Sequence, residues 1–395
     1  MLDMVYWQQS DSGTLSEDAY ITILSATTAG TIFGQIVFGY LADLLGRKKM
    51  YGVELLIIIS TTLAQSLSSS SVALNVIGLI SFWRFMMGIG VGGDYPLSAV
   101  ITSEMADTKW RGGMIGTVFA MQGFGQFFAA VMCLIVATGF KGTLQQVQEA
   151  GDCRGECQRT FDIMWRIVLA FGGIPGWFAL YYRLTIPETP RYTFDVKHDL
   201  EKAAADSRRF RSGKIGEGKT NQLEQAKVKH YMRKYKRPLP SISEFCRYFR
   251  NRRHLLVLLG TAGSWFFVDV AFYGLNLNND TILATIGFSN KANAYQYLKN
   301  TAIGQLVLVC AGQIPGYLLT VVLVDTVGRK PIQIGGFGVL TLIFAVIGFY
   351  YQHLTQGSKL ALYIIAQFFF NFGKSSGSLP EYDFATKCLI KAPTP

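Results

Sequence analysis

The sequence predicts an all-α membrane protein, a polytopic helical bundle with two related halves. Half of its 395 residues are hydrophobic and only 16% are charged, a balance that a soluble protein of this length would not show. A charged turn, Asp43-Leu-Leu-Gly46-Arg47-Lys48, recurs 282 positions later as Asp325-Thr-Val-Gly328-Arg329-Lys330, and each copy lies between two apolar segments. A repeated turn between membrane-length segments predicts a duplicated bundle, an architecture typical of transporters.

Apolar segments of membrane length follow one another along most of the chain. A bilayer core takes about 20 apolar residues per helix. We expect nine spans, at about 21–41, 50–68, 74–103, 113–140, 164–182, 255–278, 301–324, 331–351 and 360–373. The ninth is short, and nine is an odd number for a duplicated bundle.

The net charge of +11 is concentrated in one polar stretch between the fifth and sixth spans. From Asp195 to His254 the chain has 17 Lys or Arg against 7 Asp or Glu. Basic residues near span ends place that side in the cytosol, and no nucleic-acid reader motif accompanies them. We therefore expect a cytosolic loop that attracts anionic lipid, with short amphipathic helices around Leu223–Lys236.

Counting spans from this loop places both charged turns in the cytosol and residues 1–20 outside. That N-terminal segment has no Lys or Arg and no signal-peptide pattern. We therefore expect at least one helix to be missing before Met1, and more at the other end.

Charged and polar residues inside the spans are the candidate functional groups. A charge in the hydrocarbon costs about 2.5–3.5 kcal/mol on insertion scales, so it survives mainly where it faces a cavity or a partner. Arg84, Asp94 and Asp269 qualify. Glu54 lies about one turn from the end of its predicted span, so we expect it to reach the interface instead.

The sixth span has a polar stripe, because Trp265, Asp269 and Tyr273 recur at helical spacing. We expect this stripe to line a cavity; the alternative is packing or interface aromatics. The fourth span adds Gln122, which could face the cavity or bond a neighbouring helix.

The glycines at 88–93 formally match a dinucleotide-binding pattern, but no strand precedes them. Close packing of helices is the better explanation. Cys153 and Cys157 flank three residues in the expected external loop 141–162, so they could be either oxidised to a disulfide or reduced.

Three motifs in order give the chain a family resemblance. They are Gly39-Tyr-Leu-Ala-Asp43-Leu-Leu-Gly46-Arg47-Lys48-Lys49, Arg84-Phe continuing to Gly93-Asp94-Tyr95-Pro96-Leu97-Ser98, and Pro187-Glu188-Thr-Pro190-Arg191-Tyr192. Together they resemble the major facilitator superfamily. More narrowly, Gly93–Ser98, Thr102-Ser-Glu104, Lys109-Trp-Arg111-Gly112 and Trp265–Gly274 resemble the fungal high-affinity inorganic phosphate/proton symporters, from about residue 20 to Gly373.

The resemblance implies roles for matching positions. The phosphate site would consist of Tyr95, Gln122, Trp265, Asp269, Tyr273 and Asn371. Asp94 and Asp269 would couple protons. The cytosolic gating charges would be Asp43, Arg47, Glu104, Arg111, Glu188, Arg191, Asp325 and Arg329. Since an ionised Asp would repel phosphate, we expect Asp269 to bind it when protonated, within a site rich in hydrogen-bond donors.

The resemblance also implies twelve helices, of which about nine would be present. The expected domains are an external N-terminal segment (1–20), an N-terminal helical half without its first helix (21–190), a basic cytosolic loop (191–254), a C-terminal half without its last two helices (255–373) and a divergent polar tail (374–395).

The expected function is inorganic phosphate:proton symport by alternating access in the plasma membrane, with phosphate, protons and the lipid bilayer as partners. Two alternatives remain open: transport of an organic phosphate such as a glycerophosphodiester, and a non-transporting isoform or phosphate-sensing membrane protein. We expect no enzyme activity, cofactor or metal, because the four His form no metal-ligand spacing with Cys and no nucleotide-binding domain is evident.

Overall fold

The computed structural model describes residues 17–69, 75–107, 109–146, 153, 155–189, 192–193, 242–276, 278–288 and 293–390, without the side chains of 17, 242–245, 280–281 and 374–390. Within these residues every regular element is helical. The expected amphipathic helices around Leu223–Lys236 lie outside the described residues.

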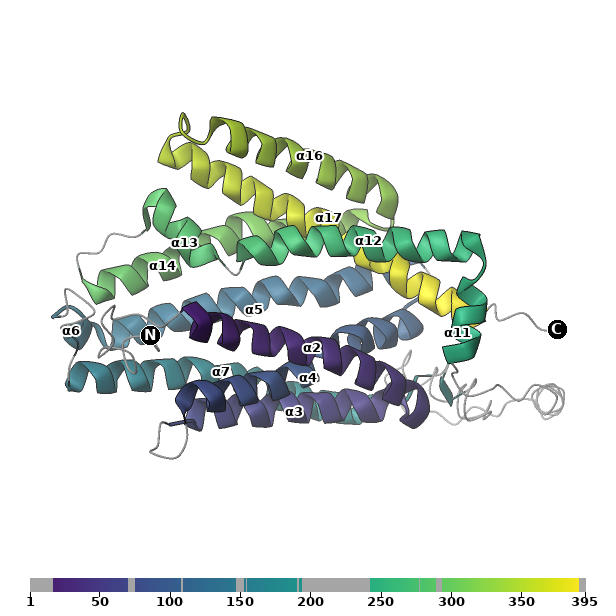
Figure 1. Cartoon of the computed structure of the whole chain (residues 1–395), viewed down its shortest axis with the longest axis horizontal. Coiled ribbons are helices and arrows are strands. Elements are labelled where there is room, and N and C mark those ends of the chain that lie inside the picture. Colours follow the sequence, from purple (N-terminus) through teal and green to yellow (C-terminus); the bar gives the residue numbers. More distant parts are fainter. Residues whose placement is uncertain are drawn as a thin grey trace. The chain divides into compact units, whose positions relative to one another are not determined.

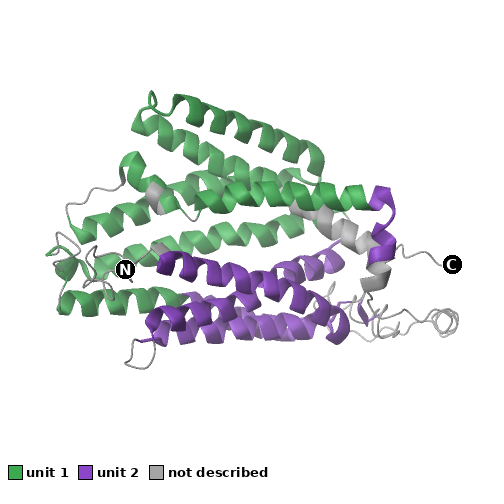
Figure 2. Cartoon of the chain, viewed as in Figure 1, with its two compact units in different colours: residues 1–15, 108–171, 255–395 green, residues 16–107, 172–254 purple. Residues whose placement is uncertain are grey.

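The chain divides into two compact units (Figure 2). Unit 2 comprises residues 16–107 and 172–254, and unit 1 comprises 1–15, 108–171 and 255–395. Unit 2 contains α2 (Glu17–Leu45), α3 (Arg47–Leu67), α4 (Val76–Met105), the second part of α7 (Glu156–Thr185) and α11 (Ile242–Phe249), labelled in Figure 1.

Unit 1 contains the first part of α7 and the remaining helices. These are α5 (Arg111–Gly139), α6 (Lys141–Leu144), α12 (Arg252–Asn276), α13 (Asn279–Leu283), α14 (Ala294–Leu308), α15 (Ile314–Leu323), α16 (Arg329–Tyr350) and α17 (Gln356–Ile390), with π-helical turns η2 (Ala284–Phe288) and η3 (Val309–Gln313) (Figure 1).

Eight helices of the described part are long and apolar enough to cross a membrane. They coincide with the first eight predicted spans, with α14, η3 and α15 forming one continuous crossing from Ala294 to Leu323. The ninth predicted span lies within α17, which is not among the eight and continues as a helix to Ile390. The prediction of an all-α, multi-pass membrane protein is confirmed.

Glycines allow the close packing of α2 against α4 in unit 2. A Cβ at Gly88 or Gly92 would overlap the backbone oxygen of Thr27 or Thr31 on α2. The interpretation of this glycine run as a helix-packing surface is therefore confirmed.

In unit 1, α15 and η3 pack closely against α17. A Cβ at Gly312 would lie 2.9 Å from the backbone oxygen of Ile364. Gly312 lies in the π-helical turn η3, and π-helical turns shift the register of a helix and often mark functional positions.

The two charged turns adopt the same backbone geometry. Gly46 (φ 107°, ψ 144°) precedes α3, and Gly328 (φ 94°, ψ 156°) precedes α16. Only glycine adopts such angles without strain. The repeated sequence thus produces a repeated local structure.

Helix α7 begins at Glu156, eight residues before the predicted start of its span at 164. Its first turns are polar, so a hydropathy window misses them. Asp162 bonds Arg166 one turn later, with Oδ2 2.9 Å from Nε, which supports the helix beyond the apolar segment. Of the two alternatives for Cys153 and Cys157, the structure has the disulfide, buried in the core of unit 1.

Candidate functional site

A cluster of charged side chains lies inside unit 2, where α3, α4 and α7 meet; two of them are largely buried, and the Asp94 side chain is 31% exposed. Arg183 Nη1 is 2.6 Å from Asp94 Oδ1 and 3.8 Å from Glu54 Oε1. The Glu54 side chain is 0% exposed and that of Arg183 14%. Asp94 thus has the partner that a charge in a span requires.

The expectation that Glu54 reaches the interface is wrong. Helix α3 begins at Arg47, so Glu54 lies two turns inside it. A Cβ at Gly93 of α4 would come within 2.6 Å of Glu54 Oε2, so the missing side chain makes room for this carboxyl. Neither carboxyl oxygen of Glu54 has a hydrogen-bond partner among the described residues.

Sequence reasoning also missed Arg183, because it falls one residue beyond the predicted fifth span. Its guanidinium carbon lies 3.8 Å from the centroid of the Tyr51 ring, a cation–π contact. Ser98 Oγ donates to Asp94 Oδ1 at 3.1 Å, which adds a hydrogen bond to this ion-paired carboxylate. The signal that could have found Arg183 is its position just before the Pro187–Tyr192 motif, directly after Tyr181 and Tyr182.

The third charged residue predicted inside a span, Arg84, turns toward α2. Its Nη1 donates to the backbone carbonyl of Ile23 at 3.4 Å. Tyr95, predicted to bind phosphate, follows Asp94 on α4 and is half-buried.

Gln122 in unit 1 is oriented by a tyrosine that the sequence did not single out. Tyr317 Oη on α15 donates to Gln122 Oε1 on α5 at 3.1 Å. The carbonyl end of the amide is thereby occupied, so its NH₂ group is the end that can donate elsewhere. Of the two readings of Gln122, the structure therefore supports a helix–helix hydrogen bond and leaves its donors available.

The predicted polar stripe lies on the uninterrupted helix α12. Trp265 Nε1 and Asp269 Oδ1 are buried atoms, whereas the Tyr273 side chain is 44% exposed. The adjacent Phe272 packs against Phe370 on α17, with ring centroids 5.9 Å apart. This contact places the stripe beside the helix that carries Asn371.

Asn371 belongs to a buried chain of polar side chains in unit 1. Its Nδ2 donates to the backbone carbonyl of Gln367 at 2.7 Å. Gln367 Nε2 donates to Tyr363 Oη at 3.1 Å, and Gln313 Nε2 of η3 donates to Gln367 Oε1 at 3.4 Å. Tyr363 Oη in turn bonds Asn279. Such buried hydrogen-bond networks fix side-chain positions, and amide spacing alone did not reveal this one.

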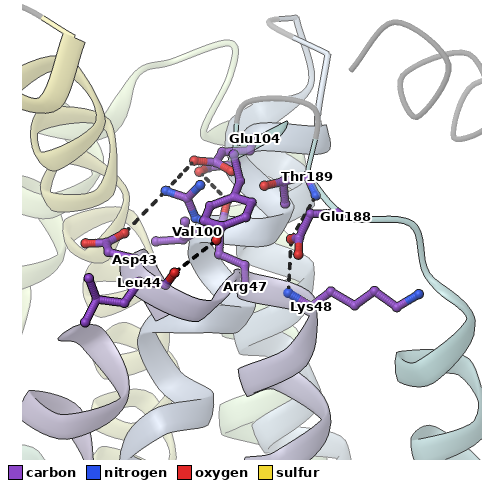
Figure 3. Close-up of polar contacts among 10 residues, drawn as sticks. Asp43, Leu44, Arg47, Lys48, Val100, Glu104, Glu188 and Thr189 are labelled. Atoms are coloured by element: carbon purple, nitrogen blue, oxygen red, sulfur yellow. Dashed lines mark hydrogen bonds and ion pairs between the residues drawn. The ribbon is translucent and has the colours of Figure 1, made fainter. Parts of the chain in front are cut away.

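Four of the expected gating charges gather at one end of unit 2 (Figure 3). Arg47 Nη2 lies 3.2 Å from Glu104 Oε1 and 3.6 Å from Asp43 Oδ1. Glu188 Oε1 accepts from the backbone N–H of Lys48 at 3.1 Å, at the first turn of α3. Burial, with Glu188 nearby, raises the pKa of Tyr192, which donates its hydroxyl to the Leu44 carbonyl at 3.2 Å.

Asp325 in unit 1 occupies the N-terminus of a helix. Its Oδ1 accepts from Gly112 N–H at 3.1 Å and its Oδ2 from Gly113 N–H at 2.7 Å. Free N–H groups and the helix dipole favour a carboxylate there. Arg111 and Arg329 are the first residues of α5 and α16, and Arg191 lies outside the described residues.

The family model described as "Sugar (and other) transporter" matches residues 2–382. The chain belongs to this transporter family. Among solved structures, the major facilitator superfamily proton:xylose symporter XylE bound to 6-bromo-6-deoxy-D-glucose aligns with a TM-score of 0.66 at 20% identity, over 96% of this chain and 75% of that one. At this identity the likeness establishes the fold, which is that of the major facilitator superfamily.

Curated relatives of this chain include proteins named as a phosphate permease and a phosphate transporter. The "Repressible high-affinity phosphate permease" of Neurospora crassa is 51% identical over 379 residues, and the "Inorganic phosphate transporter PHO84" of Saccharomyces cerevisiae is 45% identical over 381. Each alignment covers 95% of this chain but only 66% and 64% of the relatives. The chain thus spans a little under two thirds of their length.

Proposed function

We propose that this chain mediates proton-coupled inward transport of inorganic phosphate across the plasma membrane by alternating access. The observation that carries the proposal is the 51% identity, over 95% of the chain, to a protein named as a phosphate permease. The buried carboxyls of unit 2 add groups that can carry protons inside a span.

The polar residues of unit 1 suit an oxyanion that must bind and leave. Gln122 has its carbonyl held by Tyr317 and offers amide donors, and Trp265 and Tyr273 add an indole N–H and a phenol. In this proposal Asp269 loads as the neutral acid, since an ionised carboxyl would repel phosphate. The proton and the phosphate then enter together.

The charged turns would act at the cytosolic ends of the helices. In the proposal, the Arg47 ion pairs and the carboxylates at the N-termini of α3 and α5 stabilise one orientation of the transporter. Breaking them would accompany the opposite orientation.

Phosphate uptake into proteoliposomes that contain the full chain tests the proposal. We expect radiolabelled phosphate to accumulate when the outside is acidified and the gradient is intact, and Asp269→Asn to abolish the acid stimulation. Asp18→Asn, which removes an exposed carboxyl at the start of α2, is the matched control and should transport as wild type.

Two outcomes would contradict this function. Uptake equal to that of empty vesicles at every pH would favour a non-transporting or phosphate-sensing role. Uptake of radiolabelled glycerophosphodiester that far exceeds uptake of radiolabelled phosphate would favour an organic phosphate as the substrate.

A further inference from the structure

Arg183 turns into the helical bundle although it lies near the end of its helix. It is two residues before the end of α7 at Thr185, where a long side chain can usually extend to the interface. Its Nη1 instead contacts Asp94 Oδ1 at 2.6 Å and the Tyr51 carbonyl oxygen at 3.4 Å. An inward guanidinium costs solvation, so its partners must compensate.

The cluster contains one more negative group than positive. Facing Arg183 are Glu54 and Tyr51 from α3 and Asp94 from α4; at this level α2 contributes Phe38, an apolar ring against Gly93. Two ionised carboxylates with one guanidinium would leave a net charge of −1 on two largely buried side chains, Glu54 and Arg183, and on Asp94, which is 31% exposed. Burying an uncompensated charge is costly, so one carboxyl should hold a proton.

The contacts indicate which carboxyl that is. Asp94 is ion-paired with Arg183 and accepts a hydrogen bond from Ser98, and both contacts favour the ionised form. Glu54 is fully buried, its closer oxygen is 3.8 Å from Arg183, and no described residue hydrogen-bonds to it. In this arrangement Asp94 is the carboxylate and Glu54 the neutral acid.

We propose that Arg183 is a positioning residue, a shared counter-ion whose change of partner from Asp94 to Glu54 moves one proton between the two carboxyls. The O–H bond of Glu54 breaks, an O–H bond forms on Asp94, and the guanidinium moves to the new carboxylate. The cluster stays neutral throughout, so no net charge is buried at either stage. Both carboxyls already face the same nitrogen, Nη1, so the exchange requires only a small movement.

A role for this exchange in transport rests on the proposed function. The presence of the proton on Glu54 does not depend on that function. Infrared spectroscopy of the full chain in lipid vesicles, near neutral pH and without phosphate, tests the proton directly. The contribution of Glu54 is the wild-type spectrum minus that of Glu54→Gln. We expect it to contain the C=O stretch of a protonated carboxyl.

The decisive measurement determines the Glu54 contribution again in a protein that carries Asp94→Asn. It is the spectrum of the Asp94→Asn variant minus the spectrum of the Asp94→Asn/Glu54→Gln double variant. With its competitor neutralised, Arg183 should pair with Glu54, and the protonated band of Glu54 should be replaced completely by carboxylate bands. A purely structural Arg183–Asp94 pair would leave Glu54 protonated. Asp18→Asn is the matched control and should leave the Glu54 band unchanged.

Either of two results would overturn the proposal: a carboxylate signal for Glu54 in the wild type, or a protonated Glu54 that persists after Asp94→Asn. Both substitutions are nearly isosteric, and a monodisperse elution profile checks their folding. Arg183→Gln adds a third test, because Asp94 should then gain a protonated band. Since phosphate uptake is not measured, failure of the proposed function would leave these results unaffected.

Discussion

Replacing Gly93 by alanine should destabilise the protein through a steric conflict at the buried charge cluster. A Cβ at this position would lie 2.6 Å from Glu54 Oε2, 2.7 Å from Phe38 Cγ and 2.9 Å from Phe38 Cβ. The carboxyl can rotate away, but the base of the Phe38 side chain, 4% exposed, cannot move without its helix. Overpacking of this kind costs about 1–3 kcal/mol.

The matched control is Gly39→Ala on α2, where a Cβ would meet nothing within 4 Å. Both substitutions gain about 0.5–1 kcal/mol of helix propensity, so this gain cancels in the comparison. The two variants should therefore differ by about 1–3 kcal/mol in the free energy of unfolding, measured by titration with SDS in mixed micelles.

A second substitution identifies the cause of the loss. Phe38→Ala removes Cγ, the Phe38 atom nearest to a Cβ at position 93, so in the Gly93→Ala background it should recover part of the lost stability, while alone it should be destabilising. Equal unfolding midpoints for Gly93→Ala and Gly39→Ala would refute the packing argument, and so would strictly additive effects of the Gly93 and Phe38 changes.

Three further predictions concern the other polar contacts. Tyr317→Phe removes the hydroxyl that orients Gln122, so the KM for phosphate uptake should rise severalfold at nearly constant kcat; a fall in kcat alone would contradict this. Asp325→Asn exchanges a charged acceptor at the N-terminus of α5 for a neutral amide and should cost about 1 kcal/mol in SDS unfolding, whereas Asp18→Asn, at an exposed position in the first turn of α2, should cost less. Because the pKa of Tyr192 is raised on folding, its contribution to stability is present below the ordinary tyrosine range and is lost as the pH rises above about 10; Tyr192→Phe should flatten that loss, and an unchanged pH profile would contradict it.

Hydropathy was sufficient to place most of the helices, because a membrane helix must satisfy its backbone internally over a fixed length. It placed the start of α7 too late, since the polar turn around Asp162 and Arg166 is stabilised by a side-chain pair rather than by apolar residues. The glycine run of α4 was interpreted correctly because glycines in a membrane helix commonly allow the backbone of a neighbouring helix to approach closely.

The charge cluster was harder to predict, because a sequence gives the position of a charge along a helix but not the direction of its side chain. Glu54 and Arg183 both lie within reach of an interface, and extension to water is the usual outcome there. Their inward orientation depends on Asp94 and Gly93, which come from a third helix. Asp94 itself was identified because it lies too deep in its span to reach water.

The two charged turns have the same backbone conformation, but their side chains make different contacts. Gly46 and Gly328 retain the same positive φ, since the backbone of the turn depends on local residues alone. The aspartates have diverged: Asp43 pairs with Arg47, whereas Asp325 accepts from the backbone of α5.

Glu188 is the counterpart in unit 2 of this second arrangement, because it accepts from Lys48 N–H at the start of α3. Each unit therefore has a carboxylate from a distant part of the chain at the N-terminus of a membrane-length helix. The helix dipole attracts a carboxylate without requiring a basic side chain. The sequence identifies the charged residues that are important in such turns, but it does not identify their partners. Asp43 and Glu104 pair with Arg47, whereas Glu188 and Asp325 accept hydrogen bonds from backbone N–H groups.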